Sequence, residues 1–327
     1  MSEKLIIGAR GSPLSLAQTQ SVAAELKRRQ PDLTLEIRPI RTSGDDLTKL
    51  PKDLGLKGLF VQEIEKALLA GEIDVAIHSA KDLPLEIPPG LALGPTPARS
   101  SYEDALVTLA GLSFADLPRG ARIGTSSLRR QAQALAIRPD LTIIPIRGNL
   151  DTRLRHLKEG ALDGLILALV GLVRLRRDDW PRQVLSPETF TPAPGQGVLA
   201  LETRAEDQRV LRLLAPLANP EASLALALER GAAKALDAGC HTPAGVLAHR
   251  ERLGWRIRLF LAQPDGGQVK VLEAYKEVST MERAQEIGYE LGRMFLKENQ
   301  NLSPPGHEPI EEPIGEPIRE PGSAHDR

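Results

Sequence analysis

The sequence predicts an α/β protein with two consecutive α/β units followed by a small C-terminal α+β unit. Short apolar runs alternate with segments of helical periodicity from Lys4 to Leu214, a pattern typical of sheets covered by helices. The Pro-rich stretch 84–97 and the Pro/Gly segment 191–197 divide this region. After Asn219 the pattern changes to a helix, three strands and a final helix. Strands that alternate with helices favour parallel pairing in the first two units.

The first unit begins with the strand-like run KLIIGA at 4–9. Ser12 and Pro13 then mark the start of a helix, because Ser is a preferred N-cap and Pro suits the first helical position. Alternation and one-sided apolar spacing predict the next elements. They are a strand at 33–42, a helix at 60–71 and a strand at 73–78 that leads into Ser79, Ala80, Lys81 and Asp82.

The second unit restarts the alternation at Asp104. Its predicted elements are strands at 105–109, 121–124, 141–147 and 162–168, with helices at 128–136, 150–159 and one that ends at Leu175. The strand and helix that follow, at 198–214, are too few for a domain. We therefore expect the chain to cross back and complete the first sheet. The predicted domains are 1–97 together with 198–215, then 102–193, and finally 219–300.

The third unit is predicted as a small α+β domain. Its elements are helices at 221–236 and 281–297 and strands at 244–249, 255–262 and 268–276. Apolar residues alternate along the middle strand, and PDGG at 264–267 supplies a hairpin turn. The tail 301–327 repeats Glu-Pro-Ile, and since Pro every four residues cannot sustain a helix, we predict that the tail is disordered.

Composition limits the class of function. The 42 basic and 43 acidic side chains give a net charge of -1, which argues against broad electrostatic binding of nucleic acid or membrane. Aromatic residues make up only 3%, so platforms for stacking bases are scarce. No signal-like or membrane-spanning apolar run is present, so we expect a cytoplasmic protein. Nothing in the sequence resembles a large exposed apolar seam, so we expect a monomer. A single cysteine, Cys240, excludes an internal disulfide and argues against a Cys-based metal site.

Residues 119–155 form an Arg-rich stretch. It contains eight Arg against two Asp, with no Lys or Glu. TSS before LRRQ at 125–131, and GN before LDTR at 148–153, each read as a cap followed by a helix whose first turns contain Arg. Helix N-termini expose unpaired N–H groups, so guanidinium groups placed there favour binding of carboxylate or phosphate. One such Arg taken alone would be explained as a solvated or ion-paired surface residue.

Three other residues have two interpretations each. Asp82, beside Lys81 at the end of a strand, is either an ion-paired turn residue or a general acid/base in a cleft between the α/β units. His78 is better explained as a hydrogen-bonded core histidine than as a reactive group. Cys240, in a loop with Gly and Pro neighbours, is either a small buried hydrophobe or a nucleophile and attachment point. Composition does not choose between these.

Several of these stretches resemble the porphobilinogen deaminase family, also called hydroxymethylbilane synthases. The matching pieces occur in the family's order over about residues 1–250, and they are IGARGSPLSLAQ, KGLFVQEIEKALL, IDVAIHSAKDLP, IGTSSLRRQAQ, RGNLDTRL, ILALVGLVRL, PGQGVLALE and AGCHTPAG. GTSSLRRQ together with RGNLDTR is a highly specific combination, and the cysteine loop is an independent match. The resemblance implies three domains, of which the first two are similar to periplasmic binding proteins.

The resemblance also implies a reaction. The enzyme would join porphobilinogen into hydroxymethylbilane with loss of ammonia, on a dipyrromethane cofactor bound to Cys240 through a thioether. Asp82 would be catalytic, the segment 43–58 a lid, and Phe60 a residue that packs on the cofactor. The positions implied to bind carboxylates of the cofactor and substrate are Arg10, Ser12, Lys81, Ser127, Arg129, Arg130, Arg147, Arg153 and Arg174.

Two other classes of function stay open on the sequence. A cytosolic binding module that closes on a small dicarboxylate would explain the Arg-rich stretch, but it would leave Asp82 and Cys240 without a role. A nucleic-acid-binding protein is disfavoured by the near-zero net charge and the few aromatic residues.

Overall fold

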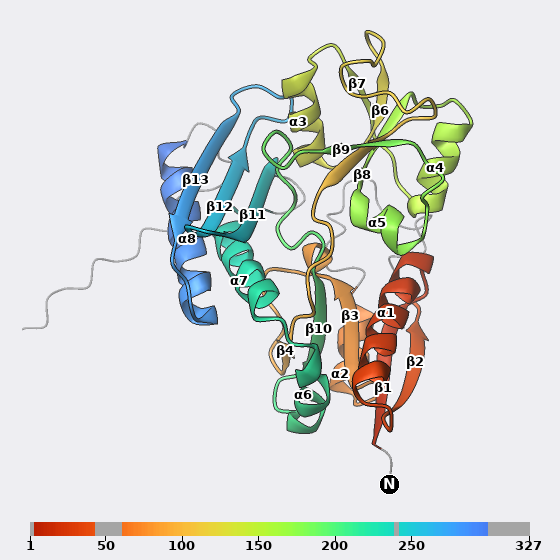
Figure 1. Cartoon of the computed structure of the whole chain (residues 1–327), viewed down its shortest axis with the longest axis vertical. Coiled ribbons are helices and arrows are strands. Elements are labelled where there is room, and N and C mark those ends of the chain that lie inside the picture. The colour runs from red at the N-terminus through yellow and green to blue at the C-terminus, as the bar shows by residue number, and fades with distance from the viewer. Residues whose placement is uncertain (1–2, 43–60, 239–241, 300–327) are drawn as a thin grey trace, which may run out of the picture.

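The computed structural model describes residues 3–42, 61–238 and 242–299. These residues form two five-stranded sheets and one three-stranded sheet, each with its own helices (Figure 1). The predicted fold class, two α/β units and a small α+β unit, is confirmed. Four predictions fall outside the described residues: the lid at 43–58, Phe60, Cys240 and the tail 301–327.

The first lobe is built on a sheet with strand order β2-β1-β3-β10-β4. Its strands are β1 (Lys4–Arg10), β2 (Thr34–Ile40), β3 (Val75–Ser79), β4 (Leu91–Leu93) and β10 (Leu199–Arg204), and its helices are α1 (Pro13–Arg29), α2 (Gln62–Leu69) and α6 (Gln208–Leu214). The strand β1 is parallel to β2 and β3, whereas β10 is antiparallel to both β3 and β4. The expectation of parallel pairing is therefore wrong for β10, because this strand enters from the second lobe in the opposite direction.

The second lobe repeats this arrangement with strand order β7-β6-β8-β5-β9. Its strands are β5 (Asp104–Val107), β6 (Arg122–Gly124), β7 (Thr142–Ile144), β8 (Gly164–Ala168) and β9 (Arg182–Leu185), and its helices are α3 (Leu128–Ile137), α4 (Leu150–Lys158) and α5 (Leu169–Arg174). Here β5, which enters from the first lobe, is antiparallel to β8 and β9, so the expectation of parallel pairing is wrong for β5 as well. Each sheet thus receives one reversed strand from a connection between the lobes.

The third lobe is an antiparallel sheet of β11 (Ala244–Glu251), β12 (Gly254–Leu261) and β13 (Lys270–Lys276), covered by α7 (Pro220–Ala235) and α8 (Met281–Glu298). Its core includes Trp255, which is 1% exposed, and the alternating apolar residues of β12. Val246 N donates a hydrogen bond to Pro192 O at 3.0 Å, and Gln131 Nε2 donates to Pro264 O at 3.0 Å. The third lobe therefore contacts both the segment around Pro192 and α3 of the second lobe.

Two connections link the first and second lobes, residues 94–103 and 186–198. Phe190 of the second connection is fully buried in the core of the second lobe, and Val198 is buried in the first. None of the helices in residues 3–42, 61–238 and 242–299 has the length and apolar character needed to cross a membrane.

Candidate active site

The turn that follows β3 places the predicted catalytic residue. Ala80–Asp82 form a single 3-10 turn at the end of this strand. Ser79 Oγ accepts a hydrogen bond from Gln18 Nε2 of α1 at 2.9 Å, and Ala80 N donates to Val198 O at 3.0 Å. The turn is therefore held by α1 on one side and by the second connection on the other. It leaves Lys81 half-buried and Asp82 exposed.

A buried acid–histidine group lies behind this turn. His78 Nε2 is 3.1 Å from Glu202 Oε2, and both side chains are buried. The core-histidine interpretation of His78 is therefore confirmed. Glu65 of α2 faces the same pair, and burial together with the charge of Glu202 raises its pKa. These residues support β3 from within the first lobe.

The start of α3 holds two buried arginines on one buried acid. Ser127 is the N-cap, and its Oγ accepts a hydrogen bond from Arg130 N at 3.4 Å. Arg129 Nη2 lies 2.8 Å from Asp104 Oδ2, and Arg130 Nη2 lies 2.8 Å from Asp104 Oδ1. Burial alone would raise the pKa of Asp104, but the charges of Arg129 and Arg130 hold it well below its usual range. Asp104 therefore remains an anion between two cations.

Backbone carbonyl groups also accept hydrogen bonds from the two arginines. Arg129 Nη1 donates to Thr191 O at 2.6 Å, and Arg130 Nη1 donates to Ile166 O at 3.3 Å. Asp104 is a partner of theirs that the sequence-based prediction did not include. The available signal was an acidic residue at the head of the apolar strand DALV, where a buried carboxylate needs a cation.

The start of α4 supplies a third guanidinium. Asn149 is the N-cap, and its Oδ1 accepts a hydrogen bond from Thr152 N at 2.9 Å. Arg153 is half-buried, and its Nε donates to Gly148 O at 2.9 Å. Burial lowers the pKa of Arg153, as does the charge of Arg130, while Asp82 acts in the opposite direction. Arg153 is thus within electrostatic reach of the acid on the first lobe.

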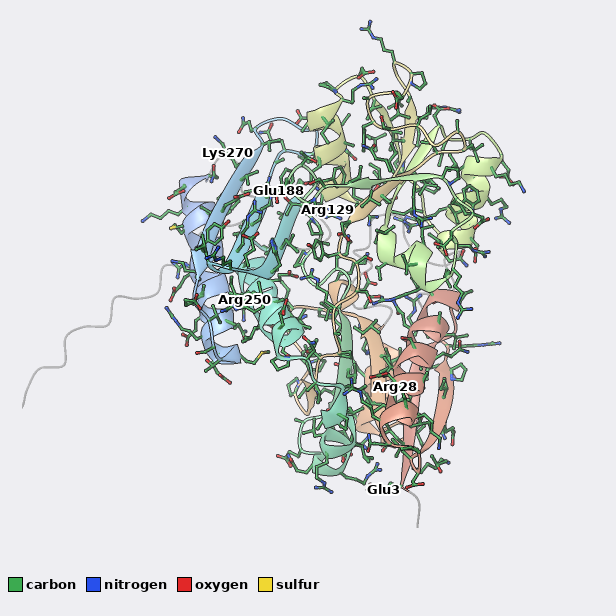
Figure 2. All side chains as sticks on the ribbon, viewed as in Figure 1. Glu3, Arg28, Arg129, Glu188, Arg250 and Lys270 are labelled. Atoms are coloured by element: carbon green, nitrogen blue, oxygen red, sulfur yellow. The ribbon has the colours of Figure 1, made fainter. Side chains whose placement is uncertain are left out.

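Lys81 faces the same group from the first lobe. Burial lowers its pKa to about 8, and the charge of Arg130 adds to this, whereas Asp82 and Asp104 oppose it. The structure therefore brings together five predicted residues from two lobes. We call this group the interlobe site, and its members are Lys81, Asp82, Arg129, Arg130 and Arg153. Arg129 lies where the lobes meet (Figure 2).

The remaining predicted residues lie on other elements. Ser12 is the N-cap of α1, and its Oγ accepts a hydrogen bond from Ser15 N at 3.3 Å. Arg10 is half-buried at the end of β1. Arg174, at the end of α5, donates from Nη2 to Gly197 O at 3.1 Å, and burial lowers its pKa to about 10.

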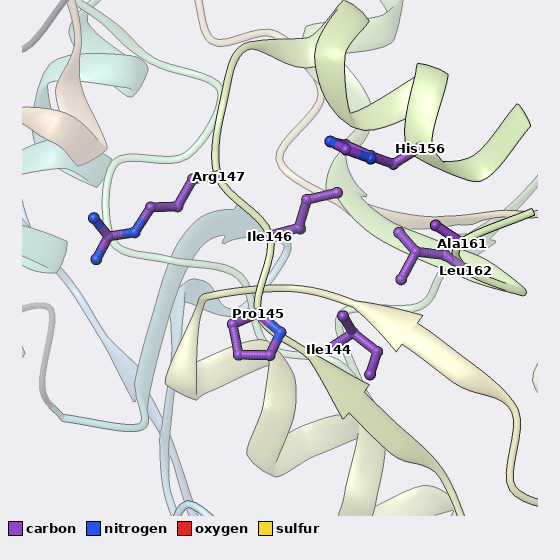
Figure 3. Close-up of a pocket in the computed structure, with 7 residues that line it drawn as sticks. All are labelled: Ile144, Pro145, Ile146, Arg147, His156, Ala161 and Leu162. Atoms are coloured by element: carbon purple, nitrogen blue, oxygen red, sulfur yellow. The ribbon is translucent and has the colours of Figure 1, made fainter. Parts of the chain in front are cut away.

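Arg147 is exposed after β7, beside a cavity of about 240 Å³. The other lining residues are Ile144, Pro145, Ile146, His156, Ala161 and Leu162. In Figure 3 the Arg147 side chain extends away from these residues. The cavity is not lined by Lys81 or Asp82, so it is separate from the interlobe site.

Other arginines of the Arg-rich stretch have acidic partners on the surface. The ion pairs are Arg122–Asp163, Arg138–Asp140 and Arg155–Glu159. For these three, the interpretation as ion-paired surface residues is confirmed. Within the described part of the chain, no three His, Cys, Asp or Glu side chains are grouped as metal ligands.

Two family models match the chain. "Porphobilinogen deaminase, dipyromethane cofactor binding domain" matches residues 5–212, and "Porphobilinogen deaminase, C-terminal domain" matches residues 223–297. Among solved structures, a Salmonella typhimurium periplasmic binding protein with high arginine specificity is similar over 68% of this chain and 96% of that chain, with 14% identity and a TM-score of 0.37.

Curated relatives match over most of their length. Proteins named porphobilinogen deaminase are 46% identical in Roseiflexus sp. (strain RS-1), over 84% of this chain and 90% of the relative, and 42% identical in Sorangium cellulosum, over 89% and 98%. The protein of that name from Thermus thermophilus is 42% identical over 90% of this chain and 96% of the relative. The chain therefore belongs to the porphobilinogen deaminase family.

Proposed function

We propose that the interlobe site carries out the reaction of this family, the joining of porphobilinogen into hydroxymethylbilane with release of ammonia, in tetrapyrrole biosynthesis. The observation that supports this most directly is that charges of the two lobes act on one another: Asp82 attracts Arg153, whereas Lys81 and Arg130 repel each other. Porphobilinogen bears an acetate and a propionate group, so a lengthening chain of pyrroles accumulates carboxylates. The cations can bind those carboxylates, and Asp82 can assist the loss of ammonia as an acid–base group.

The described residues fit a dipyrromethane cofactor, which bears carboxylates on both of its rings. Arg153 and Arg174 are half-buried cations whose pKa burial lowers. Within residues 3–42, 61–238 and 242–299, both donate to backbone carbonyls and neither has an ion pair with an acidic side chain. A half-buried cation without an acidic partner can bind a carboxylate of a bound molecule. We propose Cys240 as the attachment point, through a thioether.

When it is bound, dipyrromethane supplies the pyrrole position to which the first substrate unit is joined. Asp82 does the proton chemistry: it assists the departure of ammonia from the aminomethyl group and stabilises the resulting azafulvene cation. Asp82 then accepts the proton that the coupled ring loses. Each of four couplings releases one ammonia, and a final hydrolysis releases the product.

Lys81 and the arginines hold the substrate while Asp82 acts. Asp104 fixes the guanidinium planes of Arg129 and Arg130, so the pair is organised before any ligand binds. Arg10, Ser12, Ser127, Arg147 and Arg174 extend the binding surface in this proposal. Phe60 and the segment 43–58 would pack on the cofactor and cover the site.

Intact mass spectrometry and a turnover assay test the proposal together. The purified chain should exceed its sequence mass by one dipyrromethane, and Cys240→Ser should abolish this excess. Incubation with porphobilinogen should release ammonia and give hydroxymethylbilane, detected as uroporphyrin after cyclisation and oxidation. A folded chain of unmodified mass that still turns over porphobilinogen would reject the cofactor. Binding without ammonia release would favour the dicarboxylate-binding module instead.

We further propose that the three lobes correspond to domains 1–97 with 198–215, 102–193 and 219–300, and that the protein acts in the cytoplasm as a monomer. Light scattering during size-exclusion chromatography tests the monomer, because a stable dimer would double the measured mass.

A further inference from the structure

Gln196 lies in the second connection, at the point where the two lobes of the interlobe site meet. Its side chain is fully buried. Gln196 Oε1 accepts a hydrogen bond from Lys81 Nζ at 3.3 Å, and its Nε2 donates to Tyr102 O at 2.7 Å and to Asp104 Oδ1 at 3.0 Å. One amide therefore contacts the cation of the first lobe and the anion that organises the arginines of the second.

The chemistry of these partners fixes the direction of the amide. The Lys81 ammonium can only donate, whereas the Tyr102 carbonyl and the ionised Asp104 carboxylate can only accept. Rotating the amide by half a turn would place two donors together and two acceptors together. The amide oxygen must therefore face Lys81, and the amide nitrogen must face Asp104.

The flanking glycines bring the backbone of Gln196 close to both lobes. Gly195 has a φ of 73°, and a Cβ there would lie 3.1 Å from Lys81 N. Gly197 has a φ of 88°, and a Cβ there would lie 2.6 Å from Ser101 O. Both positions combine a positive φ with close contact to neighbouring backbone. Glycine is therefore required where residues 195–197 pass next to the backbone of Lys81 and of Ser101.

The first connection and the third lobe hold the same short segment in place. The Gln196 carbonyl accepts a hydrogen bond from Arg99 Nε at 3.0 Å. Gly195 N donates to the buried Glu229 Oε2 of α7 at 2.6 Å, and Arg99 Nη1 is 2.6 Å from Glu229 Oε1. The position of Gln196 is therefore set by contacts that do not depend on Lys81.

These contacts form a line of alternating partners from Lys81 through Gln196 and Asp104 to Arg130. We propose that Gln196 is a positioning residue for the reaction. It holds the Lys81 ammonium of the first lobe at a fixed position relative to Arg129 and Arg130 of the second lobe. This inference rests on the proposed role of the interlobe site. Gln196 itself does not touch the reacting atoms. It acts through Lys81, and its own amide is held in place by Asp104.

A double-mutant cycle tests this role. Gln196→Met keeps the length of the side chain but removes the amide, and it should lower kcat/KM for porphobilinogen about tenfold, because Lys81 loses its fixed acceptor. In a Lys81→Met background the same change should cost no more than about twofold, because the group through which Gln196 acts is gone. An equal loss in both backgrounds would overturn the proposal. Gln30→Met is the control, since Gln30 donates to Leu213 O at 2.7 Å within the first lobe.

A second variant keeps the proposal testable if Gln196→Met folds poorly. In Gln196→Glu the new carboxyl group can donate to Asp104 only while it is protonated. Its kcat/KM relative to the parent chain should therefore fall about threefold or more between pH 6 and pH 8. A ratio that stays constant over this range would contradict the proposal. Turnover by the parent chain tests the function separately, so the two failures are distinguishable.

Discussion

Asp104 and Arg130 form an ion pair at the base of the interlobe site, with Asp104 Oδ1 2.8 Å from Arg130 Nη2. The carboxylate is fully buried, and Arg130 is only 8% exposed. Because Asp104 also binds Arg129, one anion compensates part of the charge of two cations. The arginines that we propose to bind carboxylates are therefore held by a buried side chain of the protein, and their geometry does not depend on a ligand.

Asp104→Asn should destabilise the protein strongly. The neutral amide would leave two buried guanidinium groups without a counter-ion, and removing one partner of a buried pair typically costs about 3–5 kcal/mol. We expect this loss in the free energy of unfolding, measured by urea denaturation at neutral pH.

Asp140→Asn is the matched control, because Asp140 pairs with Arg138 where both side chains are partly exposed. Solvent screens that pair, so we expect only a small shift in its urea midpoint. Equal losses in the two variants would show that Asp104 is not the main counter-ion of the arginines.

Local sequence patterns predicted the elements that hold the site. Ser12 and Ser127 cap α1 and α3 as expected, because capping depends on residues only three positions apart. The short strands β4 and β9 were missed. Each has only three or four residues, with Pro nearby and little alternation. The direction of β10 was also missed, since it depends on the path between lobes.

Local sequence patterns could not identify the hydrogen-bond and ion-pair partners of the site residues. Asp104 lies 26 positions from Arg130, and Gln196 lies 115 positions from Lys81. Charge and spacing indicated a binding site at Arg130, and the family resemblance added Lys81, but neither indicated which groups hold them. The roles of Phe60 and Cys240 stay predictions, because both lie outside the described residues.

Arg153→Leu should weaken substrate binding without unfolding the protein. Arg153 is half-buried near Asp82 and Arg130, and we propose that it binds a pyrrole carboxylate. Loss of one charge-assisted hydrogen bond should raise KM for porphobilinogen about tenfold. Arg155 is on the same helix but exposed, so Arg155→Leu should leave KM within about twofold of the parent value. Similar KM values for the two variants would count against the assignment of Arg153.

Lys81 should make substrate binding sensitive to alkaline pH. Burial lowers its pKa to about 8, so the ammonium is present below this pH and is lost as the pH rises through it. If the cation binds a substrate carboxylate, kcat/KM should fall above pH 8. The measurement is a kcat/KM profile from about pH 6.5 to pH 9.5.

The control for this profile is Lys81→Arg, because a guanidinium stays charged over the whole range. The part of the alkaline fall that comes from Lys81 should then disappear, even if the variant is slower at every pH. An unchanged fall in Lys81→Arg would assign it to another group.

Asp82→Asn should nearly abolish turnover while leaving the fold and the cofactor in place. Asp82 is exposed at the end of its turn, so its replacement by an amide of the same shape removes no buried contact. The amide cannot take up the ring proton or balance the azafulvene charge, and general acid–base catalysis contributes about 100-fold to 10,000-fold. We expect kcat to fall by at least about 100-fold. Intact mass should still include one dipyrromethane.

The control is Asp116→Asn. Asp116 is an exposed acid of the second lobe that accepts a hydrogen bond from Ser113, and its replacement should keep normal turnover. Near-normal kcat in Asp82→Asn would remove Asp82 from its proposed role, whereas loss of both kcat and the added mass would place Asp82 in cofactor assembly.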